Sequence, residues 1–214
     1  MVAYYTDGTY GYNPGFFTNP LVPLYEGGEK LTNRHEASGI FKLDYEFIEG
    51  LKFTGIANVR YTFQNEESRG RKTFYKNYFT GEEFENGQNT FTDRRDYNAY
   101  YNLQALLNYK KSFGVHNLDI LAGYQQESEN TDWLKGARSG YPTDIIWELN
   151  PGPKDNWSND GNGEHWALAS FIGRINYDYD NKYILSVSMR SDASSRFAKG
   201  SRWSTFPSVA GAWR

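Results

Sequence analysis

Alternation of apolar and polar residues near the end of the chain constrains the fold more than any other feature. From Gly173 to Tyr179 the odd positions carry aromatic residues, isoleucine or glycine and the even positions carry polar residues, and the alternation returns from Tyr183 to Arg190. Successive side chains of a β-strand point to opposite faces of the sheet. The pattern therefore predicts a β-hairpin with one apolar and one polar face. The function depends on what covers the apolar face.

The same hairpin unit occurs three times along the chain. An irregular loop or strand is expected over residues 1–36, and residues 37–214 are expected to hold the hairpins and the connections between them. The predicted hairpins and the start of the next strand are at about 37–64, 97–129, 165–192 and 203–214.

The two ends of these hairpins differ in the length of their connections. Within a hairpin the turn is short, as at residues 48–50, whereas the connections 65–96, 130–164 and 193–202 are longer and rich in polar residues and glycine. Up-and-down strands with short turns at one end and long loops at the other are typical of an outer-membrane β-barrel. We therefore predict an all-β fold, an antiparallel up-and-down transmembrane β-barrel segment of about six or seven strands, with short periplasmic turns and long extracellular loops.

Composition favours a membrane barrel over a soluble domain. Aromatic residues make up 18% of the 214 residues, whereas aliphatic residues are few, so a compact soluble core is poorly supplied. The predicted strands of about 12 to 16 residues exceed the roughly 9 to 11 that cross the hydrocarbon of a bilayer. The alternative is a soluble β-sandwich acting as a carbohydrate-binding or adhesion module, but sandwich strands are typically shorter and their cores more aliphatic.

The sequence argues against enzymatic and cofactor-dependent functions. The chain has no cysteine, and its formal net charge of −3 provides no basic surface for nucleic acid. Its three histidines, His35, His116 and His165, are far apart in the sequence and follow no metal-ligand spacing. No nucleophile elbow, P-loop or dinucleotide-binding motif occurs. We therefore predict no enzyme, no cofactor and no metal, with calcium in the oxygen-rich segment 155–164 as a weaker alternative.

Several blocks of the sequence, taken in order, resemble one family. Residues 173–185, 190–197 and 202–214 are similar to the signature strands of SusC/RagA-type TonB-dependent outer-membrane transporters, and 116–127 and 43–53 fit as well. The resemblance implies a barrel of about 22 strands, of which this chain is expected to be an internal piece of the wall without the plug domain.

The resemblance also implies a function and partners. A SusC/RagA-type transporter imports oligosaccharides or other bulky nutrients, such as peptides, across the outer membrane of a Gram-negative, Bacteroidota-like bacterium. Its expected partners are outer-membrane lipid, a SusD-like surface lipoprotein, the glycan or peptide substrate, and TonB, which acts through the absent N-terminal plug region. Nucleic acid is not among them.

Two sets of residues are candidates for functional roles. One set lies on the predicted polar rows, where it would line the barrel lumen and serve a structural role: Lys52, Arg60, Gln104, Asp119, Arg174, Arg190 and Asp192. The other set consists of tryptophans in or beside one long loop, which would contact substrate or partner: Trp133, Trp147, Trp157 and Trp166. The alternative for the tryptophans is packing of the loop on itself or on the lipoprotein. On the opposite, apolar face we expect Phe41, Leu43, Val59, Leu103, Leu107, Ile120, Ile175, Leu185 and Val187.

Overall fold

The computed structural model describes residues 5–12 and 19–214, which divide into two compact units. Unit 1 is drawn from residues 1–35, 63–96 and 132–162, and unit 2 consists of residues 36–62, 97–131 and 163–214. Each unit is described separately below.

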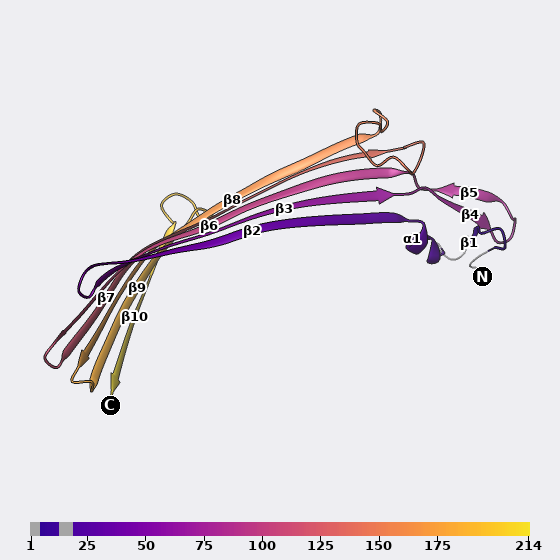
Figure 1. Cartoon of the computed structure of the whole chain (residues 1–214). Helices are drawn as coiled ribbons and strands as arrows, with labels where there is room; N and C mark the ends of the chain where they lie inside the picture. The colour runs from indigo at the N-terminus through magenta and orange to yellow at the C-terminus, as the bar shows by residue number, and fades with distance from the viewer. Residues whose placement is uncertain (1–4, 13–18) are drawn as a thin grey trace. The chain divides into compact units, whose positions relative to one another are not determined.

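Seven strands form the main sheet in the order β10-β9-β8-β7-β6-β3-β2, coloured from yellow to indigo in Figure 1. Their bounds are β2 Gly28–Ile48, β3 Leu51–Gly70, β6 Thr90–Phe113, β7 His116–Ser139, β8 Trp157–Tyr179, β9 Tyr183–Ser194 and β10 Trp203–Trp213. Consecutive strands of this sheet are neighbours, and β8 with β9 and β9 with β10 pair antiparallel. This confirms the predicted all-β, up-and-down architecture. The sheet is open, with β2 and β10 at its edges.

Several strands are longer than the hydrophobic alternation indicated. β2 begins at Gly28 rather than near residue 37, β7 continues to Ser139, and β8 already begins at Trp157. The backbone N–H of Ser139 still donates to the carbonyl of Asn156, at 3.1 Å. Backbone pairing does not require apolar side chains, so a ladder can continue into a polar segment where the sequence pattern has faded.

Three short turns join strands at one end of unit 2, which is the lower-left end in Figure 1. In the β2–β3 turn Gly50 has φ +81°, a conformation that glycine adopts without a side-chain clash. The carbonyl of Gly50 accepts the backbone N–H of Lys110 at 2.8 Å, and Asp180 donates to the carbonyl of Val115 at 2.7 Å. The β2–β3 turn is therefore bonded to β6, and the β8–β9 turn is bonded to the β6–β7 turn.

Unit 1 contains a small sheet that the sequence analysis did not anticipate. β4 (Thr73–Asn77) pairs antiparallel with β5 (Glu83–Asn86) and parallel with β1 (Tyr10–Tyr12), and the short helix α1 (Leu21–Tyr25) lies nearby in sequence. Tyr10, Val22 and Tyr75 form its buried cluster. A few large apolar side chains can anchor a short segment in this way, because full burial of each one stabilises the folded state by about 1.5–3 kcal/mol.

The connection between β7 and β8 also folds on itself within unit 1. The buried amide of Asn89 donates to the carbonyl of Tyr141 at 3.1 Å, and the Tyr141 hydroxyl donates to the carbonyl of Glu148 at 2.8 Å. Burial raises the pKa of Tyr141 above its ordinary value. Arg138 donates to the carbonyl of Gly152 at 2.7 Å. These bonds satisfy backbone groups that would otherwise need water.

Unit 2 has no layer that covers its apolar side chains. Every buried apolar residue in the described part of the chain lies in unit 1, whereas in unit 2 Phe41, Met189 and Val209 are 67%, 55% and 69% exposed. Soluble proteins rarely leave an apolar surface of this extent uncovered. In the described residues, no helix is both long enough and apolar enough to cross a bilayer.

Candidate functional site

The register of β8, β9 and β10 separates the two faces of unit 2. Arg174 pairs with Ser188 and the adjacent Ile175 with Val187, so the two pairs lie on opposite faces. Asp192 pairs with Ser170 and with Ser204, on the same face as Arg174. We call this face the polar face, and the one that carries Ile175 and Val187 the apolar face.

Side-chain contacts extend the polar face across the other strands. Asp44 accepts a hydrogen bond from Thr54 at 2.6 Å and lies 3.2 Å from the ammonium of Lys52. Arg60 lies over the ring of Tyr100 at 5.1 Å. These contacts place two of the predicted lumen residues, Lys52 and Arg60, on one face of β3.

The remaining predicted lumen residues join the same face. The Asn108 amide donates to Asp119 at 2.6 Å, and Gln104 donates to Asn102, two residues before it on β6, at 3.1 Å. Asn117 donates to Asp178 on β8 at 3.3 Å, which links β7 to the strand that carries Arg174. All seven residues predicted from the alternation therefore share one face. Whether that face lines a lumen remains a prediction.

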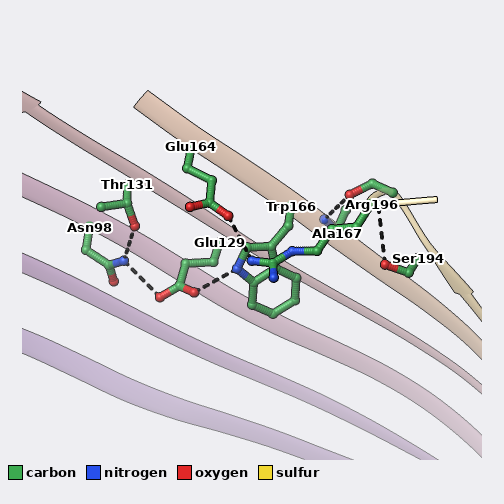
Figure 2. A network of polar contacts seen from close by, with 9 residues as sticks. Asn98, Glu129, Thr131, Glu164, Trp166, Ala167, Ser194 and Arg196 are labelled. Carbon is green, nitrogen blue, oxygen red and sulfur yellow. Dashed lines mark hydrogen bonds and ion pairs between the residues drawn. The ribbon is translucent and has the colours of Figure 1, made fainter. Parts of the chain in front are cut away.

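A network of polar contacts on this face is centred on Glu129 (Figure 2). One carboxylate oxygen of Glu129 accepts the amide of Asn98 at 2.8 Å, and the other accepts the indole N–H of Trp166 at 2.9 Å. Asn98 also donates to the hydroxyl of Thr131 at 2.7 Å. A hydrogen bond to an ionised acceptor is stronger than one between neutral groups. Glu129 therefore fixes side chains from β6 and β8.

Arg196 completes this network from the β9–β10 connection. Its guanidinium lies 5.7 Å from the Trp166 ring centroid and donates to Glu164 at 2.9 Å (Figure 2). Both ionic side chains are more than half exposed, so the ion pair contributes little by itself. The cation–π contact places the charge beside one face of the indole.

A second charged group lies on β9. Arg190 donates through Nε to both carboxylate oxygens of Asp192, at 2.7 and 3.0 Å, and through a terminal nitrogen to the hydroxyl of Ser170 at 3.1 Å. Because Arg190 and Asp192 are two positions apart on one strand, they lie on the same face and pair along the strand.

The four tryptophans do not form one aromatic cluster. Trp133, Trp147 and Trp157 belong to unit 1 and Trp166 to unit 2. Trp147 contacts Phe91, at 6.5 Å between ring centroids, and the guanidinium of Arg69 at 5.8 Å. Trp147 therefore lies against residues of β6 and β3.

The other two tryptophans of unit 1 differ in their surroundings. Trp133 stacks with the guanidinium of Arg94 at 4.3 Å, and Trp157 is 63% exposed.

The segment proposed as a weaker calcium candidate is mostly extended. Residues 157–164 belong to β8, where successive side chains alternate between faces instead of converging as an EF-hand loop does. Among residues 5–12 and 19–214, no three His, Asp or Glu side chains form a ligand group.

Sequence reasoning did not single out Glu129 as a candidate. The sequence did contain a signal for one part of the network, the contact between Asn98 and Thr131. These two residues are equally far from the turn between Phe113 and His116 and are therefore expected to pair. The bond from Trp166 to Glu129 had no such signal, since it depends on the register between β7 and β8 across a long connection.

Comparison with known proteins shows what this sheet resembles. No family model matches the chain. The chain is 32% identical over 214 residues to TonB-dependent receptor P3 of Formosa agariphila, an alignment that covers 98% of this chain and 20% of the relative. It is 28% identical to TonB-dependent receptor SusC of Bacteroides thetaiotaomicron, with 97% of this chain and 20% of SusC covered. The chain thus spans about one fifth of the length of these relatives.

Solved structures show the same fold. The structure of the RagAB peptide transporter superposes with a TM-score of 0.78 at 22% identity and covers 91% of this chain and 21% of that chain. The open-open state of the RagAB peptide importer gives 0.77. These proteins are receptors and transporters, not enzymes, which confirms the prediction of no enzymatic activity. In sequence the chain is thus similar to TonB-dependent receptors, SusC among them, over nearly its whole length, and its main sheet has the fold of the RagAB structures.

Proposed function

We propose that the chain forms part of the barrel wall of a TonB-dependent outer-membrane transporter that imports oligosaccharides, peptides or other bulky nutrients. The observation that carries this proposal is the division of unit 2 into an uncovered apolar face and a hydrogen-bonded polar face. A barrel wall meets lipid outside and an aqueous lumen inside, and each strand must then alternate in this way.

The polar face has the chemistry of a lumen lining. Several of its charged groups are paired or bonded to neutral donors, as Arg190 is with Asp192 and Glu129 with Asn98. A wall of this kind presents fixed hydrogen-bonding groups without a large net charge, which suits the hydration of a plug and of bulky polar solutes. We assign the predicted lumen residues to this role, listed as Lys52, Arg60, Gln104, Asp119, Arg174, Arg190 and Asp192.

Among the tryptophans, Trp166 is the best candidate for contact with a passing solute. It lies on the polar face, its indole N–H is already bonded to Glu129, and its ring is held beside Arg196. An indole fixed in this way offers an apolar surface at little further entropic cost. Trp147 is the weakest candidate because its ring already lies against Phe91 and the guanidinium of Arg69.

The remaining parts of the transporter are proposals drawn from the family. In this arrangement residues 37–214 form part of the barrel wall. A plug domain engages TonB, and a SusD-like lipoprotein covers the outer opening of the barrel. The solved relative RagAB is named as a peptide transporter, so peptides are a substrate class to test alongside glycans.

Cysteine scanning in the full-length receptor tests the assignment of the two faces. These 214 residues contain no cysteine, and any cysteine elsewhere in the receptor is first replaced by serine. Single cysteines are then placed at the adjacent residues Arg174 and Ile175, and at Ser188 and Val187, which pair with them. In intact outer membranes a small water-soluble maleimide should modify the cysteines at 174 and 188 and leave those at 175 and 187 unmodified. Equal labelling of the members of each adjacent pair, or labelling only of 175 and 187, would contradict the proposal.

A further inference from the structure

The apolar face of unit 2 has a groove near the short turns. Its volume is about 720 Å³. The side chains that line it include Phe47, Phe53, Ala105, Leu107, Ala122 and Tyr124. Two alanines on adjacent strands thus lie among larger aromatic and leucine side chains, which leaves a depression at the alanines.

Alternation shows that the groove opens on the apolar face. Asp44 and Thr54 bond on the polar face, so Phe47 and Phe53, at odd positions on the same strands, point the other way. Asn108 bonds to Asp119 on the polar face, so Ala105 also lies on the apolar face. If the proposed function holds, the groove faces the hydrocarbon of the outer membrane.

One cation lies beyond the turn-side end of the groove. Lys110 lies 3.6 Å from Asp119, and Ser112 donates to Asn117 at 2.7 Å, both on the polar face. Lys111, between them, therefore lies on the apolar face, in the same row of β6 as Ala105 and Leu107. Within the described part of the chain, the Lys111 ammonium has no hydrogen bond or ion pair, and the residue is exposed.

An apolar groove that ends at a cation matches a phospholipid, which has an apolar chain and an anionic phosphate. A strand of another protein does not fit, because its backbone N–H and C=O groups would be unsatisfied in lipid. Basic residues at a membrane surface attract anionic groups by about 1 kcal/mol each. Outer-membrane barrels have short turns on the periplasmic side and longer loops on the outside. In the proposed transporter the short turns therefore lie on the periplasmic side, and the lipid belongs to the inner leaflet.

We infer that the chain carries a specific site for one phospholipid of the inner leaflet of the outer membrane, with an acyl chain in the groove over Ala105 and Ala122 and the phosphate at Lys111. This site rests on the proposed function, since it needs the apolar face to be in the bilayer. It is more specific than general lipid contact, because both ends of the lipid are matched.

Native mass spectrometry of the full-length receptor tests the site. The receptor is delipidated in detergent and titrated with palmitoyl-oleoyl phosphatidylethanolamine. Ala105→Phe and Ala122→Phe fill the groove and should each weaken the tightest binding event about tenfold, which corresponds to excluding about two methylenes. Lys111→Gln should weaken it about fivefold.

Matched controls separate the site from effects on folding. Ala169→Phe adds the same ring to the apolar face outside the groove, and Lys110→Gln removes the neighbouring charge from the polar face. Both should leave lipid binding unchanged.

Localisation of the receptor decides between two kinds of failure. If the wild-type receptor is absent from outer membranes and shows no heat-modifiable barrel band, the proposed function itself fails. If the receptor is a folded outer-membrane barrel but Ala105→Phe, Ala122→Phe and Lys111→Gln bind the lipid as the wild type does, only the lipid site is overturned. Equal weakening by Lys110→Gln and Lys111→Gln would also overturn it.

Discussion

A lysine at Val187 should destabilise the barrel far more than a lysine one position earlier, at Ser186. Val187 pairs with Ile175 and with Val209 on the apolar face, whereas Ser186 pairs with Asn176 and donates to its side chain at 2.7 Å on the polar face. The two substitutions add the same side chain to the same strand, so the difference between them reports on the environment of each face.

The position of Val187 along β9 determines the expected free-energy cost of a lysine there. It lies four residues beyond Tyr183, where the strand begins. With a rise of about 3.3 Å per residue and a tilt near 45°, this is roughly 9 Å into an apolar band about 25 Å tall. A lysine this close to the midplane costs about 2–3 kcal/mol. At Ser186 the expected cost is about 1 kcal/mol, from the lost hydrogen bond.

Reversible unfolding of the full-length receptor in liposomes, followed by its heat-modifiable migration, measures the two costs. The cost of about 2–3 kcal/mol at Val187 corresponds to a roughly 30- to 150-fold change in the folding equilibrium relative to wild type, and the cost of about 1 kcal/mol at Ser186 to a roughly fivefold change. The expected order is wild type, Ser186→Lys, then Val187→Lys. Equal costs, or a larger cost at Ser186, would show that the apolar face does not meet lipid.

Three further predictions concern the turns and unit 1. Gly50→Ala should destabilise the receptor by about 1–3 kcal/mol in the same unfolding assay, because Gly50 has a positive φ and a Cβ there would collide with the carbonyl oxygen of Lys110. Tyr141→Phe removes a hydrogen bond from a side chain that is 5% exposed, and should speed hydrogen exchange of residues 140–156 as expected from a loss of about 1 kcal/mol. Hydrogen bonds from Thr9 and Lys76 hold the pKa of Asp7 well below its ordinary 3.8. A carboxyl group with a lowered pKa stabilises the folded state at any pH above its ordinary pKa, and this stabilisation is lost as the pH falls through the lowered pKa. Proteolysis of the β1–β4 region should therefore be constant above about pH 5 and increase only in strong acid.

Each of these predictions has a matched control. Gly114 also has a positive φ but has no neighbouring atom near a Cβ, so Gly114→Ala should cost less than Gly50→Ala. Tyr25 is 64% exposed, and Tyr25→Phe should leave exchange of the loop unchanged. Asp7→Asn should remove the acid dependence of proteolysis. A cost at Gly114 equal to that at Gly50, a normal loop in Tyr141→Phe, or acid sensitivity that persists in Asp7→Asn would contradict the respective explanation.

The architecture of the main sheet was predictable because each face repeats every second residue. Arg174 and Ile175 carry the information about their faces in their own chemistry, and short turns join their strand to its neighbour, so the register follows from local sequence. The alternation has exceptions. Ile172 and Phe206 pair with Arg190 on the polar face, where an apolar residue was not expected.

The structure of unit 1 and the details of the candidate site were less predictable. The parallel pairing of β1 with β4 and the bond from Asn89 to Tyr141 join segments far apart in the sequence, and neither has a periodic pattern. Glu129 was expected on a strand, but its role depends on Trp166, whose placement follows from the register of β7 and β8. Long-range register is determined by the whole sheet, and local sequence does not encode it.

The pairing of Arg190 with Asp192 along a single strand has a consequence for how such a wall can vary in evolution. Two partners that lie two positions apart on one strand remain paired whatever the register of the neighbouring strand. The ion pair between Arg190 and Asp192 therefore does not fix the alignment of strands. The apolar row does fix it, and the loss or gain of one residue within a strand would turn that row toward water along the rest of the strand. We expect such walls to accept many substitutions within their strands but few single-residue insertions, whereas a connection such as 140–156 can change length by any number of residues.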